Sequence, residues 1–386
     1  MSQSRQSFRD AGIMPLLSEV LFEKPKSSIQ LYKSWSGIVM MEGVYVADVG
    51  DGFCSAIFEG LGEVAQIDCG GRDAEHAFDG MERIADHHSP DTFFLSHYHI
   101  DHYNGLLFSS TRHRTSPLRV RNVYYPRLPK FKKNEEFLRS LFAINMRVFG
   151  DETGIREYDF LNAILHINNG TPFRQKGLSR GDMVELNGSV LEILWPPIEI
   201  SRKTTLNVID RALEDFQKAL EDRVTMELFE RVNKEDKFRA FLHGDVSYYE
   251  GTDKNQNRQN PADVPLLPKR ELPPVVKKAN ESLKKAANHM SLAFFEGSNL
   301  LFLGDAEAFE IRQISTELKS KGKQDFSVFI TPHHGTHWHD SLRQIKCVYS
   351  ITSNGSKLCS KMKPHFKEIS KYSLATFANG DIVCGY

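Results

Sequence analysis

Short apolar runs separated by glycines follow one another along the chain from Val44. The runs VYVADVG, CSAIFEG and EVAQIDCGG have the length and the β-branched content of consecutive strands joined by tight turns. A polar helix is predicted over residues 73–86, and TFFLSH then predicts a buried strand. Further along, GDMVELNGSVLEILWPP predicts a hairpin that turns at Asn187-Gly188. This part of the chain therefore indicates a β-meander followed by further strands.

Helical spacing then replaces the strand pattern. Apolar residues from Leu213 to Val232 keep the three-to-four-residue spacing of one amphipathic helix. The polar, proline-rich segment EGTDKNQNRQNPADVPLLPKRELPP predicts a long loop or lid, so residues 201–285 are predicted to form a helical and lid-like insertion. The last third returns to strands in SLAFF, NLLFLGD, FSVFITP and CVYSITS, with a helix in AEAFEIRQISTEL. Alternating strands and helices predict an α/β layer structure.

Composition narrows the class of protein. The 386 residues are 40% hydrophobic and carry 49 basic against 50 acidic side chains, which excludes disorder as the main state and any global field for polyanions. We expect an N-terminal extension over residues 1–40 and one domain over residues 41–386. No run of 18 apolar residues occurs and the first residues lack an apolar signal core, so we expect no membrane partner and a cytoplasmic location. The five cysteines never form a CxxC pair and are expected to be buried hydrophobes.

The segment FLSHYHIDHYNG carries the strongest chemical signal. It places His97, His99, Asp101 and His102 directly after a predicted strand, where alternating side chains project the same way before the chain turns. Neutral imidazoles together with a carboxylate form the mixed nitrogen and oxygen shell of hydrolytic metal sites. The sequence therefore predicts a metal centre at the end of this strand.

This motif resembles the His-x-His-x-Asp-His signature of the metallo-β-lactamase-fold hydrolase superfamily. Within that superfamily the chain is most similar to the soluble hydrolase domain of bacterial competence DNA-uptake channel proteins. Further segments match in the same order from Val44 onward, namely DVGDGFCSAIF, QIDCGG, NHMSLAF, LLFLGDAE and TPHHGTHW. The resemblance implies an α/β fold, a four-layer αβ/βα sandwich with the metal site at one edge of its two sheets.

The resemblance also implies two divalent metal ions, with zinc expected and manganese as the alternative. His97 and His99 would bind the first ion, Asp101 and His102 the second, and Asp305 would bridge both. Asp101 would in addition accept a proton from the attacking water. Asp68 would lie outside the ligand shell and orient a ligand imidazole.

Two ligand positions stay open at this stage. His289 is the candidate third ligand of the first ion, with His243 and His166 as rivals. For the last ligand of the second ion we favour His334, which is also a candidate catalytic residue, over His365. The other candidates for that position are His333, His337 and His339, and His333 could instead contact a substrate phosphate.

The expected function is a phosphodiesterase or nuclease in which a metal-held hydroxide attacks a phosphodiester. No GxSxG elbow or P-loop occurs, so no acyl-enzyme or nucleotide motor is indicated. Residues 112–133 hold eight Lys or Arg and no acid, interleaved with aromatic residues, which suits single-stranded DNA or RNA. The substrate-binding candidates are Arg112, Arg114, Tyr124, Arg127 and His337, and Tyr125 and Phe131 are further candidates for stacking on bases.

Two other functions remain open from the sequence. One is a metal-dependent hydrolase of a small ester, lactone or amide, which would have an apolar pocket. The other is a non-catalytic, metal-stabilised component of a bacterial defence or stress module, acting through a protein partner that the sequence does not identify.

Overall fold

The computed structural model describes residues 42–59, 62–87, 89–111, 118–153, 159–186, 188–234, 241, 246–251 and 271–386. The chain divides into two units, Met1–Ser36 and Gly37–Tyr386, and the architecture below is that of the second unit. The extension expected over residues 1–40 lies outside the described residues, and the domain boundaries stay a prediction.

The first sheet has eight strands in the order β15-β1-β2-β3-β4-β5-β6-β9. Its strands are β1 (Gly43–Val46), β2 (Gly52–Glu59), β3 (Glu63–Gly71), β4 (Thr92–Phe94), β5 (Asn122–Pro126), β6 (Phe173–Leu178), β9 (Ser247–Tyr249) and β15 (Ile382–Gly385). β1, β2 and β3 pair antiparallel, as the meander prediction requires, whereas β3, β4, β5 and β6 run parallel. The carboxyl ends of these parallel strands therefore meet at one edge.

The second sheet has seven strands in the order β14-β13-β12-β11-β10-β8-β7. Its strands are β7 (Met183–Leu186), β8 (Ser189–Trp195), β10 (Ala293–Glu296), β11 (Leu300–Phe302), β12 (Asp325–Ile330), β13 (Lys346–Thr352) and β14 (Ser370–Ala375). β7 and β8 form the predicted hairpin, in which Gly188 supplies the positive φ of the turn. β11 to β14 are parallel, so this sheet also has an edge where several carboxyl ends meet.

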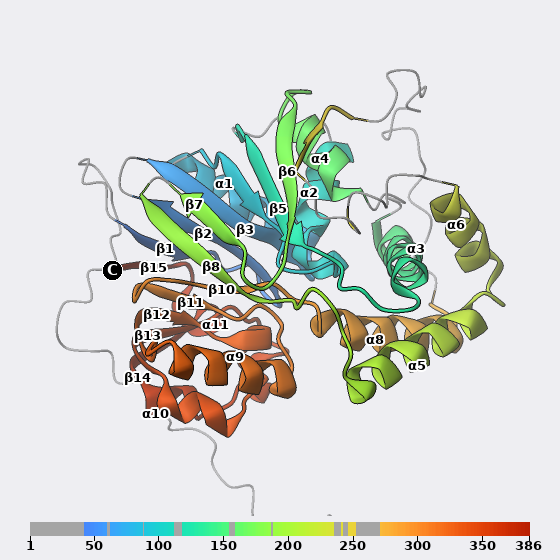
Figure 1. Cartoon of the computed structure of the whole chain (residues 1–386). Helices are drawn as coiled ribbons and strands as arrows, with labels where there is room; N and C mark the ends of the chain where they lie inside the picture. Colours follow the sequence, from blue (N-terminus) through green and yellow to red (C-terminus); the bar gives the residue numbers. More distant parts are fainter. Residues whose placement is uncertain are drawn as a thin grey trace, which may run out of the picture. The chain divides into compact units, whose positions relative to one another are not determined.

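Three apolar clusters separate four layers. The middle cluster joins the facing sides of the two sheets, with Phe94 and Ile67 from the first packed near Phe294 and Phe302 from the second. A second cluster lies between the outer face of the first sheet and helices α1 (Ala74–His87), α2 (Asn104–Thr111), α3 (Asn134–Thr153) and α4 (Phe160–Ile167). A third lies between the other sheet and α9 (Ala308–Ser320) and α10 (Phe366–Ile369). Figure 1 shows the sheets stacked, and the predicted four-layer αβ/βα sandwich is confirmed.

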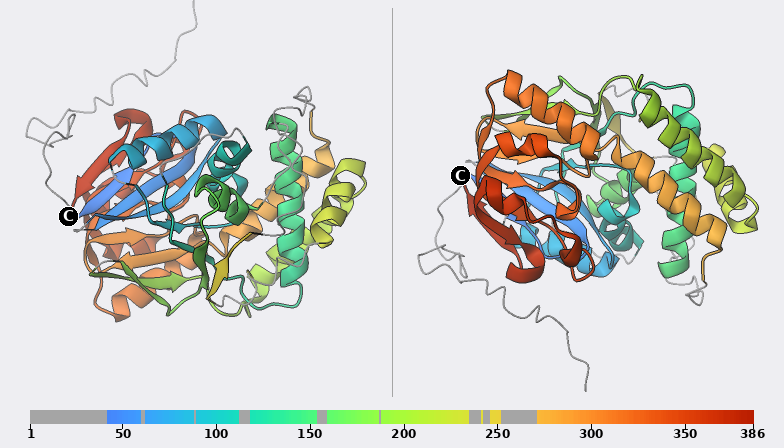
Figure 2. Two further views of the ribbon diagram at one scale, coloured as in Figure 1. Left: turned by 90° about the horizontal axis from the view of Figure 1, so that it is seen from above. Right: turned by 90° about the horizontal axis from the view of Figure 1, so that it is seen from below.

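The insertion contains α5 (Lys203–Ala219), α6 (Arg223–Asn233) and α8 (Pro274–Asn288). The single amphipathic helix predicted through Val232 is wrong, because the Asp222 carboxylate accepts a hydrogen bond from the backbone N–H of Thr225 and begins a second helix there. α5 lies against α8, and both contribute to the same apolar cluster as α3 (Figure 2). The loop or lid predicted after this helix lies largely outside the described residues.

Four of the five cysteine thiols are buried and all five are unpaired, as expected of small apolar side chains. Three short 3-10 helices, η1 (Ile100–His102), η3 (Pro332–Gly335) and η4 (Asp340–Gln344), follow β4 and β12 at the edge where the sequence places its metal motif. A fourth, η5 (Cys359–Lys361), and a short helix α11 (Thr376–Asn379) complete the described elements.

Glu59 at the end of β2 forms a buried acidic pair with Glu296 at the end of β10. Its side chain is 4% exposed, and burial, followed by the charge of Glu296, raises the pKa of Glu59 to about 7. The folded protein therefore binds the proton of the Glu59 carboxyl more tightly than the unfolded chain does. The stability that this protonated carboxyl contributes is fully present below the pKa of the unfolded chain and is lost as the pH rises through 7.

We expect Glu59→Gln to raise the free energy of unfolding by about 1–3 kcal/mol at pH 8, because it removes a charge that is costly to bury. The gain should shrink steadily towards pH 5, where the wild-type carboxyl is protonated. Denaturant melts across this range would measure it, with the exposed Glu185→Gln in β7 as the matched control. A gain that does not change with pH would contradict the assignment.

Candidate metal centre

The histidine motif lies where β4 ends and the chain enters η1. His97, His99 and His102 are buried, although histidine is a polar residue, and Asp101 keeps 29% of its side chain exposed. The Asn104 side chain holds this loop, since its amide donates to the carbonyl of Gly71 and accepts from the N–H of Gly71. These two hydrogen bonds connect the loop of the motif to the end of β3.

Asp305 is the centre of the cluster. It follows β11, and its side chain is buried. Its Oδ2 lies 3.8 Å from Nε2 of His97, 3.7 Å from Nε2 of His102 and 3.9 Å from Nε2 of His334. Nitrogen and oxygen ligands about 2.1 Å from a tetrahedral ion lie about 3.4 Å apart, so these separations are close to those of a shared ion.

The electrostatics of the cluster favour an ionised Asp305 carboxylate and neutral imidazoles at His97 and His99. Burial alone would raise the pKa of Asp305, but the imidazoles led by His333 and His334 outweigh it and hold that pKa far below its usual range. Burial lowers the pKa of His97 well below its ordinary value and that of His99 to about 4. Neutral imidazoles keep the lone pair that a metal ion needs.

Four buried imidazole nitrogens have no hydrogen-bond partner among the described residues. They are Nε2 of His97, His99, His102 and His289. A buried polar atom without a partner is costly, and four in one region need a common explanation. One ligand atom each from His97, His102 and Asp305 come together within 4.8 Å of one another. The residues present thus fit a divalent metal centre.

The Nδ1 atoms of His102 and His334, on the other side of each ring from Nε2, contact oxygen atoms. Nδ1 of His102 lies 2.6 Å from Oδ2 of Asp68, and Nδ1 of His334 lies 3.0 Å from the carbonyl of Ser353. Burial opposes a charge on His102, but the carboxylates of Asp68 and Asp305 raise its pKa to about 9. Such oxygen partners fix the tautomer of an imidazole and direct its other nitrogen at a metal.

His289 ends α8 and is held in the same way. Its Nδ1 lies 2.9 Å from Oε1 of Glu310, whose side chain is 0% exposed within α9. The indole N–H of Trp195 donates to the carbonyl of His289 at 2.7 Å. Its Nε2 is left without a partner, which is the arrangement of a ligand imidazole.

Backbone strain is concentrated at this centre. Asp68 (φ 54°), His333 (φ 49°) and His334 (φ 55°) adopt the left-handed conformation, which is unfavourable for residues with a Cβ. Asp68 lies in a β-bulge of β3, where the register with β2 shifts between Phe53 and Ser55. The strain is a reason to expect function at these positions rather than packing alone.

Two glycines allow backbone segments of the site to pack closely against one another. A Cβ on Gly70 would lie 2.2 Å from the carbonyl oxygen of Asp101, and one on Gly304 would lie 2.6 Å from that of Leu292. Gly304 also has a φ of +50°. Glycine before Asp305 and in the QIDCGG segment is therefore required for the backbone to pack this closely.

Some predicted residues lie elsewhere. His365 contacts Glu368 and the ring of Trp338 on the half-exposed rim, and the structure thus gives it no contact with Asp305. His166 lies on α4 and is not in the cluster. Arg112, Arg114 and His243 are outside the described residues.

The aromatic residues of the basic stretch are used in packing. Tyr125 is fully buried, so the idea that it stacks on a base is wrong. Tyr124 is stacked on Phe94 at 5.0 Å, and Phe131 packs against Phe137. Burial of these aromatic side chains stabilises the fold more than exposure would. The many basic residues around them gave no indication of that burial. Arg127 donates its backbone N–H to Leu178, while its Nε is buried.

Sequence reasoning missed Lys284 and Glu310. Lys284 lies on α8 with its Nζ 3.5 Å from Oδ2 of Asp101, and Glu310 is the partner of His289. A buried acid five residues after Asp305, within an otherwise apolar helix face, was the available signal for Glu310. Lys284 had no signal, because lysines are common on the exposed faces of helices.

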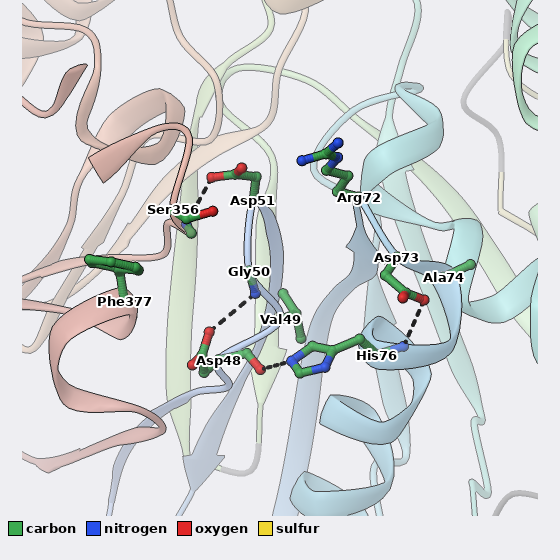
Figure 3. Close-up of a pocket in the computed structure, with 11 residues that line it drawn as sticks. Asp48, Val49, Gly50, Asp51, Arg72, Asp73, Ala74, His76, Ser356 and Phe377 are labelled. Carbon is green, nitrogen blue, oxygen red and sulfur yellow. Dashed lines mark hydrogen bonds between the residues drawn. The ribbon is translucent and has the colours of Figure 1, made fainter. Parts of the chain in front are cut away.

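A pocket of about 640 Å³ is lined by the turn between β1 and β2, the start of α1 and the segment after β13 (Figure 3). Two of its lining residues are close in sequence to the metal motif's neighbours. Arg72 follows Gly70, which packs against the backbone of Asp101, and Gly355 follows Ser353, whose carbonyl contacts His334. The carboxylates of Asp48, Asp51 and Asp73 accept backbone N–H groups, whereas Arg72 has no dashed contact to the residues drawn. The pocket is therefore lined by three carboxylates and the Arg72 guanidinium, together with the apolar side chains of Val49, Ala74 and Phe377.

No family model matches the sequence, and no curated protein matches it either. The structural neighbours are metallo-β-lactamase-fold proteins. The metallo-beta-lactamase fold protein YhfI from Bacillus subtilis aligns over 88% of this chain and 99% of its own, at 8% identity and a TM-score of 0.38. MEM-A1, a subclass B3 metallo-beta-lactamase from a soil metagenome library, aligns over 77% and 78%, at 12% identity and a TM-score of 0.29.

Among the described helices, none is both long and apolar enough to cross a membrane.

If His289 is a ligand held by Glu310, Glu310→Gln should weaken metal binding about 10- to 100-fold, because the amide holds the imidazole less firmly in the ligand tautomer. Competition between the protein and a chromophoric chelator for zinc would measure it. Glu317→Gln, on the same helix but partnered by Arg180, is the control. Unchanged affinity in Glu310→Gln would remove His289 from the ligand set.

Proposed function

We propose that the chain is a metal-dependent hydrolase that binds two divalent cations. The observation that carries this proposal is the buried Asp305 carboxylate surrounded by imidazoles whose Nε2 atoms have no partner among the described residues. His97, His99 and His289 would hold one cation, and Asp101, His102 and His334 the other, with Asp305 shared. When bound, two such cations lower the pKa of water and stabilise negative charge on the group under attack. Zinc suits this set of imidazoles and carboxylates, and manganese is the alternative.

The protein side chains would orient the reaction. Asp101 is the ligand with the most accessible carboxylate, so it is the residue placed to accept a proton from water. Asp68 holds Nδ1 of His102 and keeps that ring turned towards Asp305. Because no serine or cysteine nucleophile is required, the reaction we propose is direct hydrolysis by water.

We further propose that the substrate is a phosphodiester of single-stranded DNA or RNA. The centre contains four carboxylates, those of Asp68, Asp101, Asp305 and Glu310, and the ammonium of Lys284. With two divalent cations its net charge would be about +1, which favours an anionic substrate. Lys284 lies next to Asp101 and is the cation placed to contact a phosphate.

The alternative substrates are small esters, lactones or amides. That function calls for an apolar pocket. The pocket of about 640 Å³ contains Val49, Ala74 and Phe377 as well as Asp48, Asp51, Arg72, Asp73 and His76, so it does not separate the two substrate classes. The motif resemblance to the hydrolase domain of DNA-uptake channel proteins favours the phosphodiester.

We expect zinc- or manganese-loaded protein to cleave end-labelled single-stranded DNA or RNA, and the Asp101→Asn Asp305→Asn variant to lose this activity by at least about 10³-fold, roughly 4 kcal/mol in the barrier. Separation of the products on a gel would also distinguish internal from terminal cleavage. No cleavage by protein that has bound both ions would reject the nucleic-acid substrate, and panels of small esters and lactones would then be tested. A folded, metal-loaded protein inactive on all of them would favour the non-catalytic component.

Lys284→Met should raise the KM for single-stranded DNA about tenfold, which corresponds to about 1.4 kcal/mol, because it removes a cation next to Asp101. Lys285→Met, at the exposed neighbouring position of the same helix, is the matched control. Metal content is measured on both variants, so that loss of an ion is not mistaken for loss of substrate contact. A KM equal to that of the control would show that Lys284 does not contact the substrate.

A further inference from the structure

A second group of potential ligands lies beside the Asp305 cluster. Glu307, His333 and His337 each offer one ligand atom, and these atoms all lie within 4.8 Å of one another. All three side chains are half-buried, in contrast to the buried residues around Asp305. The Nδ1 of His333 is 4.0 Å from Oδ2 of Asp305, so the two groups are neighbours.

The local sequence brings the two imidazoles together. In the segment HHGTH, His333 and His337 are four residues apart, the separation that brings two histidines to one zinc ion in helical HExxH motifs. Here a turn does the same: His333 has the left-handed backbone conformation, and Thr336 donates its hydroxyl to the carbonyl of His333. The ring centroids of the two histidines are 3.9 Å apart.

The separation of His337 and Glu307 fits two ligands of one ion, and Nδ1 of His337 also lies 3.4 Å from the carbonyl oxygen of Ala306. Nδ1 of His337 lies 3.5 Å from Oε2 of Glu307, which is longer than an N–H···O hydrogen bond. It is close to the separation of about 3.4 Å between two ligands of one tetrahedral zinc ion. The amide of Asn288, which is 4% exposed, donates to Oε1 of Glu307 at 3.2 Å and lies 3.3 Å from Nδ1 of His333. A buried amide thus positions two of the three side chains.

His333 has other neighbours than His334, although its Nδ1 also lies 4.0 Å from Oδ2 of Asp305. His334 already directs its Nε2 at Asp305 while the carbonyl of Ser353 holds its Nδ1. The rings of His333 and His334 are nearly perpendicular, at 85°, with centroids 6.1 Å apart. The two adjacent histidines therefore serve different groups.

We propose that Glu307, His333 and His337 form a third metal site for a zinc-like divalent cation. Two imidazoles and one carboxylate are a zinc ligand set, and they select Zn²⁺ or Co²⁺ over Mg²⁺ and Ca²⁺, which prefer oxygen. Three protein ligands leave at least one position for water or for an anionic ligand. The site is weaker than the Asp305 centre because it is half-exposed and because Glu307 precedes α9, whose N-terminus repels cations.

The test counts bound ions on the full chain. Protein stripped by chelator is dialysed to equilibrium against saturating Zn²⁺ or Co²⁺, and elemental analysis gives the number of ions per chain. We expect His337→Ala and Glu307→Gln each to bind one ion fewer than the wild type, and Mg²⁺ not to displace that ion. His365→Ala, a rim histidine that contacts Trp338 and Glu368, is the matched control and should bind as many ions as the wild type.

The readout is a difference between variants, so it does not depend on how many ions the Asp305 centre holds. Asp305→Asn should retain the third ion, and its Co²⁺ absorption bands should disappear when His337→Ala is added. Equal ion counts in the wild type, His337→Ala and Glu307→Gln would overturn the proposal. So would a loss of more than one ion from Glu307→Gln, which preserves the shape of the side chain, because the two groups would then be a single site.

Discussion

The buried charge of Asp305 is the constraint on which the site depends. A carboxylate so far removed from water is strongly unfavourable unless positive or polar groups compensate it. The compensating groups come from loops that are distant in sequence, after β4 and after β12, and all are directed at one oxygen atom. The Nε2 atoms of His97 and His102 lie beside this carboxylate and have no hydrogen-bond partner among the described residues. The same feature thus explains the convergence of the loops and the fit to a metal.

The surrounding fold maintains this convergence at some conformational cost. Three residues of the site hold left-handed backbone conformations that cost of order 1–3 kcal/mol each, and such conformations persist only where the surroundings determine them. Here the surroundings are the fixed ends of parallel strands, the close approach of Gly70 to the Asp101 backbone, and the bulge at Asp68. The rigid sandwich of two sheets therefore stabilises loops that would not adopt these conformations alone.

The helical insertion belongs to the site rather than to the periphery. Its last helix, α8, presents Lys284 to Asp101, places Asn288 between Glu307 and His333, and ends at His289. Because α8 also packs through its apolar face against α5 and α3, its position depends on the rest of the insertion. Changes in the insertion would therefore alter the cation and the amide beside the centre without touching the strands.

Local spacing in the sequence predicted the strands, their α/β layering and the cluster of His97, His99 and His102 after a strand, whereas the four-layer sandwich and the role of Asp305 came from the motif resemblance. Period-two and short apolar runs identify strands, and a polar motif directly after such a run must lie at a sheet edge. The sequence by itself did not predict that the helix is divided at Asp222, where one capping hydrogen bond begins a second helix. It also indicated a surface position for Tyr125, although Tyr125 is buried in the core.

Only the tertiary structure placed His334 rather than His365 beside Asp305, paired Glu310 with His289, and brought Lys284 to Asp101. Each of these depends on contacts between elements far apart in the chain, and on side-chain directions fixed by a strained turn. The spacing of residues along the chain does not predict these contacts or these side-chain directions, because the distance between two side chains in a packed sandwich is set by how the sheets and helices stack.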